Sequence, residues 1–143
     1  MQTLQGPAIF LAQFMADDEP FNTIVAMAQW AARLGFVGMQ VPIGNPAFID
    51  VGLAAHSTDS CAELRERVAA HGVEITELST HLEGQLVAVH PAYNEMFDGF
   101  APAQLRGNAT ARTEWAVEQV KLAAQASRNL GLTEHATFCG ALP

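Results

Sequence analysis

Basic residues are scarce in this sequence. It contains 7 Lys and Arg against 15 Asp and Glu in 143 residues, which gives a net charge of −8. Nucleic-acid backbones and anionic membrane surfaces bind proteins through clusters of positive charge. The composition therefore weighs against a nucleic acid or a membrane surface as the partner.

Cysteines and long apolar runs are also scarce. The two cysteines, Cys61 and Cys139, lie far apart and form no CxxC pair. A disulfide framework is therefore not indicated, and we expect a reducing compartment and a cytoplasmic protein. No stretch of about 18 apolar residues is present, and the N-terminus lacks the basic region of a signal peptide. We accordingly expect neither a membrane span nor a secretion signal.

Several short functional motifs are missing as well. The sequence contains no GxGxxG, P-loop, GxSxG or HExxH pattern. Half of the residues are hydrophobic, which is enough for a packed core in a chain of this length. We therefore expect residues 1–143 to form a single globular domain. Cys61 falls on a predicted helix and Cys139 in a predicted strand, so neither is expected to be a nucleophile.

Strand-like and helix-like segments alternate along the chain. Apolar, strand-like runs cover residues 8–14, 36–41, 73–80 and 135–139, and helical spacing of apolar residues covers 22–34, 60–71 and 108–130. Each predicted helix ends at a glycine, namely Gly35, Gly72 and Gly131. This βαβαβαβ pattern predicts an α/β fold with a parallel sheet and right-handed crossovers.

Local signals place the helix starts and the longer loops. Asn22 is predicted to cap the first helix, and Ser60 with Glu63 forms a predicted capping box for the second. Residues 48–55 are expected to form a short helical piece. Residues 81–107 are long for a loop, and long ordered loops after strands tend to be functional.

Polar side chains gather where the predicted strands end. Gln13 and Gln40 lie near the ends of the first two strands, His81 follows the third, and His90 lies in the loop beyond it. The carboxyl ends of parallel strands meet at one edge of a sheet, which is where α/β enzymes bind substrate. We therefore predict Gln13, Gln40, His81 and His90 as substrate-binding residues.

Each of these residues also has a simpler interpretation. His81 could bond backbone carbonyls at the strand end, His90 could be an ordered loop residue, and Gln40 could serve internal polar packing. The nine-residue spacing of the two histidines is not that of a typical metal pair. Glu83 and Gln85, which follow His81, are expected to be solvated.

Three segments resemble a known family. TELSTHLEGQLVAVHPAY, the opening GPAIFLAQF and the helix EWAVEQVKLAAQASRNLGL are similar to the N-terminal part of a sugar phosphate isomerase/epimerase. These enzymes belong to the xylose-isomerase-like TIM-barrel superfamily, which also includes endonuclease IV-type enzymes. The resemblance implies a partial (β/α)8 TIM barrel, with three βα units and a fourth parallel strand. It also implies a sugar or sugar phosphate as the substrate.

The resemblance further implies that part of the site lies outside this chain. In the family, a divalent metal (Mg, Mn or Zn) and the acid/base carboxylates are held mainly by later strands. No catalytic or metal-binding residue is therefore assigned in 1–143, and we expect this chain to bind no metal by itself and to be inactive alone. Gln40 stands where many members carry an acidic residue, which keeps hydrogen bonding there but loses the charge.

Two alternatives to an isomerase or epimerase follow. The first is a non-catalytic half-barrel whose open sheet edges self-associate or pair with a complementary half. Its inner face, with Leu11, Met39 and Ile75, is expected to be partly exposed. The second is a repair endonuclease of the same superfamily, which the negative charge disfavours.

Overall fold

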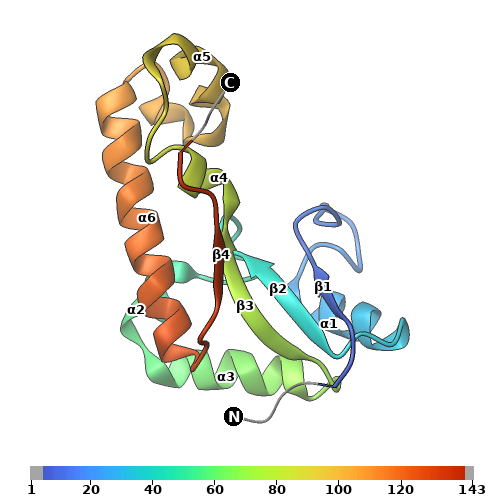
Figure 1. Ribbon diagram of the computed structural model, residues 1–143. Coiled ribbons are helices and arrows are strands. Elements are labelled where there is room, and N and C mark those ends of the chain that lie inside the picture. Colours follow the sequence, from blue (N-terminus) through green and yellow to red (C-terminus); the bar gives the residue numbers. More distant parts are fainter. Residues whose placement is uncertain (1–4, 141–143) are drawn as a thin grey trace.

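The protein is an α/β structure built on a four-stranded parallel sheet (Figure 1). A computed structural model describes residues 5–140. The strands are β1 (Ala8–Phe10), β2 (Gly38–Pro42), β3 (Glu74–Thr80) and β4 (His135–Thr137). They lie in the order β1-β2-β3-β4, and every neighbouring pair is parallel. The predicted α/β class and parallel sheet are confirmed.

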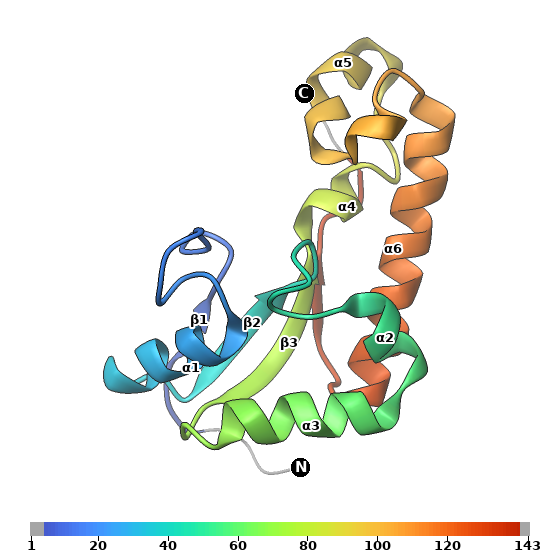
Figure 2. The ribbon, with the colours of Figure 1, turned by 180° about the vertical axis from the view of Figure 1, so that it is seen from behind.

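The longer helices connect these strands. They are α1 (Ile24–Arg33), α2 (Val51–His56), α3 (Thr58–Ala69) and α6 (Ala109–Asn129). In the described part of the chain, no helix is both long enough and apolar enough to cross a membrane. Figure 2 shows α1, α2 and α3 in front of the strands, with α6 alongside β4.

One continuous core joins these helices to one face of the sheet. Strand residues Met39, Val41 and Leu78 are fully buried in it, together with Met27 of α1 and Ala126 of α6. Side chains alternate between the two faces of a strand, so Gln40 points to the opposite face from Met39 and Val41. The sheet therefore has one helix-covered face and one face on which Gln40 lies.

The expected exposure of Leu11, Met39 and Ile75 is wrong. Leu11 and Met39 are 0% exposed and Ile75 is 7% exposed, and all three belong to the core beneath the helices. Met39 and Ile75 are register partners on neighbouring strands, so their side chains share the helix-covered face. The face of the sheet opposite the helices carries Gln40 instead.

Most predicted helix ends are confirmed, whereas two predicted helix starts are wrong. Gly35, Gly72 and Gly131 follow their helices with φ values of +86°, +78° and +73°, a conformation that favours glycine. Thr23, not Asn22, caps α1, because its side chain accepts a hydrogen bond from the Ala26 amide. Ser57, not Ser60, caps α3, and accepts from the Ser60 amide at 3.1 Å.

The first strand is shorter than predicted. The Leu11 amide still donates to the Gln40 carbonyl at 3.1 Å, but the Phe14 amide then turns back to the Leu11 carbonyl at 2.9 Å. An apolar run extends to Phe14 because Phe14 packs against Trp30 of α1, with ring centroids 5.1 Å apart. Apolar character here therefore marks packing on a helix, not continuation of the strand.

The long segment between β3 and α6 is folded into short helices. These are α4 (His81–Gln85), α5 (Asn94–Phe97) and three 3-10 turns, η1 (Pro91–Tyr93), η2 (Asp98–Phe100) and η3 (Ala103–Leu105). Leu86 and Ala101 of this segment are buried against Ala116 in a second, smaller core. The segment therefore packs on the first half of α6, and the prediction of an ordered loop is refined to a helical one.

Candidate functional site

A cavity of about 850 Å³ lies at the carboxyl ends of the first three strands. Residues that follow or end these strands supply its walls, together with α4 and the segment after β4. The lining residues are Phe10, Ala12, Gln13, Met15, Gln40, Pro42, Gly44, Asn45, Ser79, His81, Leu82, Glu83, Gln85 and Phe138. We call this the strand-end cavity. It brings together three of the four predicted substrate-binding residues, Gln13, Gln40 and His81.

Gln40 is held in the cavity wall by a neighbouring strand. Its Nε2 donates a hydrogen bond of 2.6 Å to Glu77 Oε1. The two residues are register partners because the pairing of β2 with β3 shifts between Met39 and Gln40. This irregularity skips one residue of β3 and turns Glu77 toward Gln40. Gln40 thus has internal polar packing and also borders the cavity.

Two oxygen atoms in this wall have no hydrogen-bond partner among the described residues. They are Gln40 Oε1 and Ser79 Oγ, and both are buried. Buried polar atoms are normally satisfied, so such atoms at a cavity are candidates for ligand contact. Both oxygens are covered from water, and a ligand bond to either requires a rotation of its side chain. The pair favours a ligand that donates hydrogen bonds.

His81 stands at the start of α4, between two aromatic rings. Its imidazole centroid lies 5.0 Å from that of Phe10 and 4.8 Å from that of Phe138. Thr80 precedes it as the last residue of β3 and is fully buried. Two aromatic neighbours from β1 and from the segment after β4 fix the ring plane, so His81 presents a nitrogen in a defined direction.

Gln13 and His90 have different surroundings. Gln13 is exposed, in the turn that follows β1, and it lines the strand-end cavity. His90 is exposed at the start of η1, where its Nδ1 accepts a hydrogen bond of 3.2 Å from the Ala92 amide. Its ring centroid lies 5.9 Å from that of Tyr93. His90 is therefore a capping residue of the helical segment, apart from the residues that line the cavity.

Glu83 differs most from its expected surroundings. It was expected to be solvated, but it is 7% exposed and forms part of α4. Burial raises the pKa of its carboxyl above the ordinary value of 4.5, and a hydrogen bond from its own backbone amide opposes this effect. A carboxyl of this kind holds its proton more tightly than a solvated one. Glu83 is thus a titratable group in the cavity wall that the sequence did not reveal.

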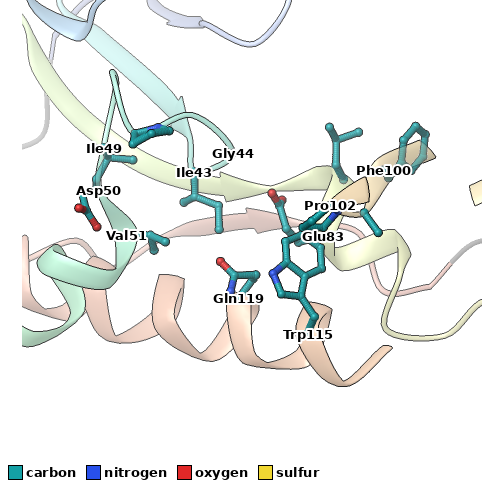
Figure 3. A pocket seen from close by; sticks show the side chains of 13 residues that line it. Ile43, Gly44, Ile49, Asp50, Val51, Glu83, Phe100, Pro102, Trp115 and Gln119 are labelled. Atoms are coloured by element: carbon teal, nitrogen blue, oxygen red, sulfur yellow. The ribbon is translucent and has the colours of Figure 1, made fainter. Parts of the chain in front are cut away.

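Glu83 also borders a second cavity, of about 470 Å³ (Figure 3). This one lies between the loop after β2 and the first turns of α6, and we call it the α6 cavity. Trp115 and Gln119 of α6 face Ile43 and Val51 across it, with the Glu83 carboxyl between. Glu83, Leu82 and Gly44 line both cavities.

A histidine behind the wall is held by hydroxyl groups. His135 Nε2 lies 3.0 Å from Thr80 Oγ1, and its Nδ1 lies 3.2 Å from Ser127 Oγ. Burial lowers the pKa of His135, the charge of Glu77 raises it, and His81 lowers it further. This imidazole ties β4 to β3 and α6, and so supports the segment that carries Phe138.

The donor set of the described residues does not fit a divalent metal. No three His, Cys, Asp or Glu side chains in residues 5–140 lie close enough together to hold one. The strand-end cavity offers one buried carboxyl, one imidazole and several amides, which suit hydroxyl groups better than Mg²⁺, Mn²⁺ or Zn²⁺. No chemical step is therefore assigned to a metal on these residues.

Neither Cys61 nor Cys139 is among the described residues that line the two cavities. Cys61 is buried in α3, where its Sγ donates to the Ala54 carbonyl at 3.3 Å, and burial raises the pKa of its thiol. A thiol with a raised pKa is a poor nucleophile at neutral pH. Cys139 is exposed just after β4.

Sequence reasoning located the edge of the sheet but missed several side chains there. Ser79, Glu83 and Phe138 belong to the cavity wall beside Gln13, Gln40 and His81. Ser79 lies two residues before His81, and residues two apart in a strand share one face, so the sequence does carry a usable signal for Ser79. No feature of the neighbouring sequence distinguishes Glu83 from a solvated loop residue, because residues distant in the chain, at Gly44 and in α6, bury it.

Comparisons with known proteins did not extend these observations. Neither a scan against protein-family models nor a search of curated proteins found a match for this chain.

Proposed function

We propose that this chain is the N-terminal portion of a sugar or sugar phosphate isomerase/epimerase with a (β/α)8 barrel. Two features of the fold support this. The strands lie side by side in chain order, and α1, α3 and α6 share one core on one face. Successive right-handed βα units with all helices outside are the arrangement of a barrel wall, whereas doubly wound sheets reverse their strand order. The three similar sequence segments add to this support.

The observation that carries the proposal is the polar wall of the strand-end cavity. Gln40 and Ser79 hold oxygen atoms there that find no partner in the described part of the chain, and His81 presents an imidazole in the same wall. Sugars present several hydroxyl donors on a small apolar ring, and Phe10 and Phe138 supply apolar surface next to the polar groups. These residues are assigned to substrate binding.

The proposed reaction is proton transfer next to a carbonyl, with a divalent metal in the complete enzyme. Such a metal polarises carbonyl and hydroxyl oxygens when it is bound. Residues 5–140 contribute no fitting ligand set, so their part in the proposal is to bind and orient the sugar. The chain by itself is expected to bind sugar weakly and to show no turnover.

A binding titration tests the proposal. Purified, ¹⁵N-labelled chain is titrated with D-fructose and D-xylulose, and amide chemical shifts are recorded. We expect saturable shifts at Phe10, Gln40, Ser79 and His81, which His81→Ala weakens and His71→Ala does not. His71 is the matched control because it follows α3, at the other end of β3. Random or absent shifts contradict the sugar site.

An activity assay tests the second part of the proposal. The same sugars are incubated with the chain and Mg²⁺, Mn²⁺ or Zn²⁺, and aldose–ketose conversion is followed by NMR. We expect no conversion. Turnover that His81→Ala abolishes contradicts the assignment of the catalytic groups to other strands.

Association with a second chain is another candidate function. β1 and β4 are the two edges of the sheet, and Phe138, just beyond β4, is 51% exposed beside His81. An unpaired edge next to exposed apolar surface favours pairing with another copy or with a complementary half. Sedimentation equilibrium tests this: we expect dimers that Phe138→Ser weakens, and a concentration-independent monomer contradicts it.

A further inference from the structure

We propose that the sugar bound in the strand-end cavity carries a protonated amine, and that the Glu83 carboxylate receives it. The ligand class is an amino sugar or an amino polyol. This inference rests on the proposed function, because it assigns the substrate class of the same cavity. It goes beyond that function in giving Glu83 a role in specificity.

The first argument is the isolation of the Glu83 carboxyl. It is 7% exposed, and among the described residues its hydrogen-bonding partner is its own backbone amide. An ionised carboxylate buried in this way is costly unless a cation pairs with it. A positive group on the ligand would offset that cost at the moment of binding.

The second argument is the charge of the surroundings. The described residues that line the two cavities include Glu83 and Asp50 but no Lys or Arg. The protein supplies the negative partner of an ion pair and leaves the positive partner to the ligand. The chain's net charge of −8 also attracts cations over longer distances.

The third argument is the space beside the carboxyl. A Cβ atom at Gly44 would lie 3.3 Å from Glu83 Oε1, and glycine leaves this position open. Gly44 lines both cavities, as Glu83 does. A ligand group can therefore approach the carboxyl next to the Gly44 backbone. Figure 3 shows the carboxyl on the side of the α6 cavity, between Ile43 and Trp115 and near Gly44, which belongs to both cavity walls.

The fourth argument is the arrangement of the remaining polar groups. Gln40, Ser79 and His81 line the same cavity as Glu83, and the first two carry oxygens that have no hydrogen-bond partner within residues 5–140. The Gln40 oxygen and the Glu83 carboxylate only accept hydrogen bonds, and the Ser79 hydroxyl and the His81 imidazole can also accept them. Such a wall favours a ligand rich in donors, which hydroxyls and an ammonium group on one small ring provide.

The experiment compares three sugars that differ at one position. D-glucosamine, D-glucose and N-acetyl-D-glucosamine are titrated into the ¹⁵N-labelled chain at about pH 6.5, where an amine is mainly protonated. We expect glucosamine to bind on the order of tenfold more tightly than the two neutral sugars, with amide shifts at Glu83 and Gly44.

Two variants separate the ion pair from the rest of the site. Glu83→Gln keeps the shape of the side chain and should remove the preference for glucosamine, so that glucosamine and glucose bind the variant with similar affinity. Glu114→Gln, an exposed position on α6, removes the same charge elsewhere and should preserve the preference. Circular dichroism verifies that both variants fold.

The outcomes distinguish this inference from the proposed function. If the three sugars bind with equal affinity at the cavity, or if Glu83→Gln keeps the preference, the amine assignment is overturned and the sugar site stands. If none of the sugars binds, the proposed function fails and the inference fails with it. A preference that Glu83→Gln removes supports both.

Discussion

Gln40 and Glu77 are joined across two parallel strands by a hydrogen bond of 2.6 Å from Gln40 Nε2 to Glu77 Oε1. The register shift between Met39 and Gln40 makes these two residues partners. The bond leaves Gln40 Oε1 without a partner among the described residues, so the orientation of one amide determines which acceptor remains at the cavity.

Gln40→Glu should destabilise the protein at neutral pH by about 1–3 kcal/mol, because it replaces this bond by two facing carboxylates. Two close carboxylates have a higher pKa in the folded protein than in the unfolded chain. The loss of folding stability is therefore complete above the folded pKa and disappears below the unfolded pKa. Urea unfolding at several pH values measures this. Gln29→Glu, exposed on α1, is the control and should change stability little. Equal stability of the two variants at pH 7 contradicts the pairing.

Glu83→Gln should make the protein more stable at neutral pH. Burial raises the pKa of the Glu83 carboxyl in the folded state. The folded protein then binds more protons than the unfolded chain between the two pKa values, so the free energy of unfolding falls as pH rises through that window. The gain of the variant over the wild type is therefore largest above the folded pKa and vanishes below the ordinary value of 4.5. Chemical denaturation from acid to neutral pH provides the measurement, and a gain that does not change with pH rules out this account.

Gly84→Ala should disturb the strand-end cavity through the segment after β4. A Cβ atom at Gly84 would overlap the Phe138 carbonyl oxygen and the Thr137 hydroxyl. We expect a loss of about 1–3 kcal/mol and changed amide shifts at His81, because Phe138 packs on its ring. Gly99→Ala is the matched control, since a Cβ atom there meets nothing within 4 Å. Wild-type stability of Gly84→Ala would show that this contact is not tight.

Arg112→Met should loosen the helical segment before α6. Arg112 is 1% exposed and donates to the Asn94 carbonyl at 2.7 Å, to Asn94 Oδ1 at 2.6 Å and to Asp98. Loss of these bonds removes the partners of half-buried acceptors on Asn94 and Asp98 and should cost about 2 kcal/mol. Hydrogen exchange should rise in η1, α5 and η2 but not in α3. Exchange that rises equally in both regions would indicate global destabilisation instead.

The same Asp98 anchors the segment on its other side. Its Oδ2 accepts a hydrogen bond of 2.8 Å from the Gly107 amide, and this bond, with the nearby Arg112 and Arg106, keeps the pKa of the Asp98 carboxyl below its ordinary value. No sequence pattern predicts this network. A solvated loop and a helical segment anchored on α6 have similar local composition. Only contacts between residues far apart in the chain, such as Arg112 with Asp98, distinguish the two.

Sequence periodicity predicted the strands and long helices because it reflects local physical chemistry. Apolar residues at helical spacing define α1 and α6, and glycines with positive φ end the helices at Gly35, Gly72 and Gly131. The capping residues were misplaced by one to three positions. Neighbouring Asn, Ser and Thr have similar capping ability, and packing of the helix selects among them.

Three of the four predicted site residues meet at the strand-end cavity, and His90 does not. Gln13, Gln40 and His81 meet because parallel strands align their carboxyl ends, which the alternating pattern already required. His90 lies apart, since the residues after His81 form α4 and then pack into the second core with Ala116 of α6. Nearness in sequence to a strand end therefore predicts membership of the site only over the first two or three residues.

By itself, the sequence determined the βα alternation, the parallel sheet and the edge at which polar side chains gather. These depend on residue spacing, glycine positions and handed crossovers, all of which are local. The tertiary structure alone decided that Glu83 is buried between two cavities, that Glu77 pairs with Gln40, and that Leu11, Met39 and Ile75 face the helices. These depend on strand register and on contacts between residues far apart in the chain, which no local pattern encodes.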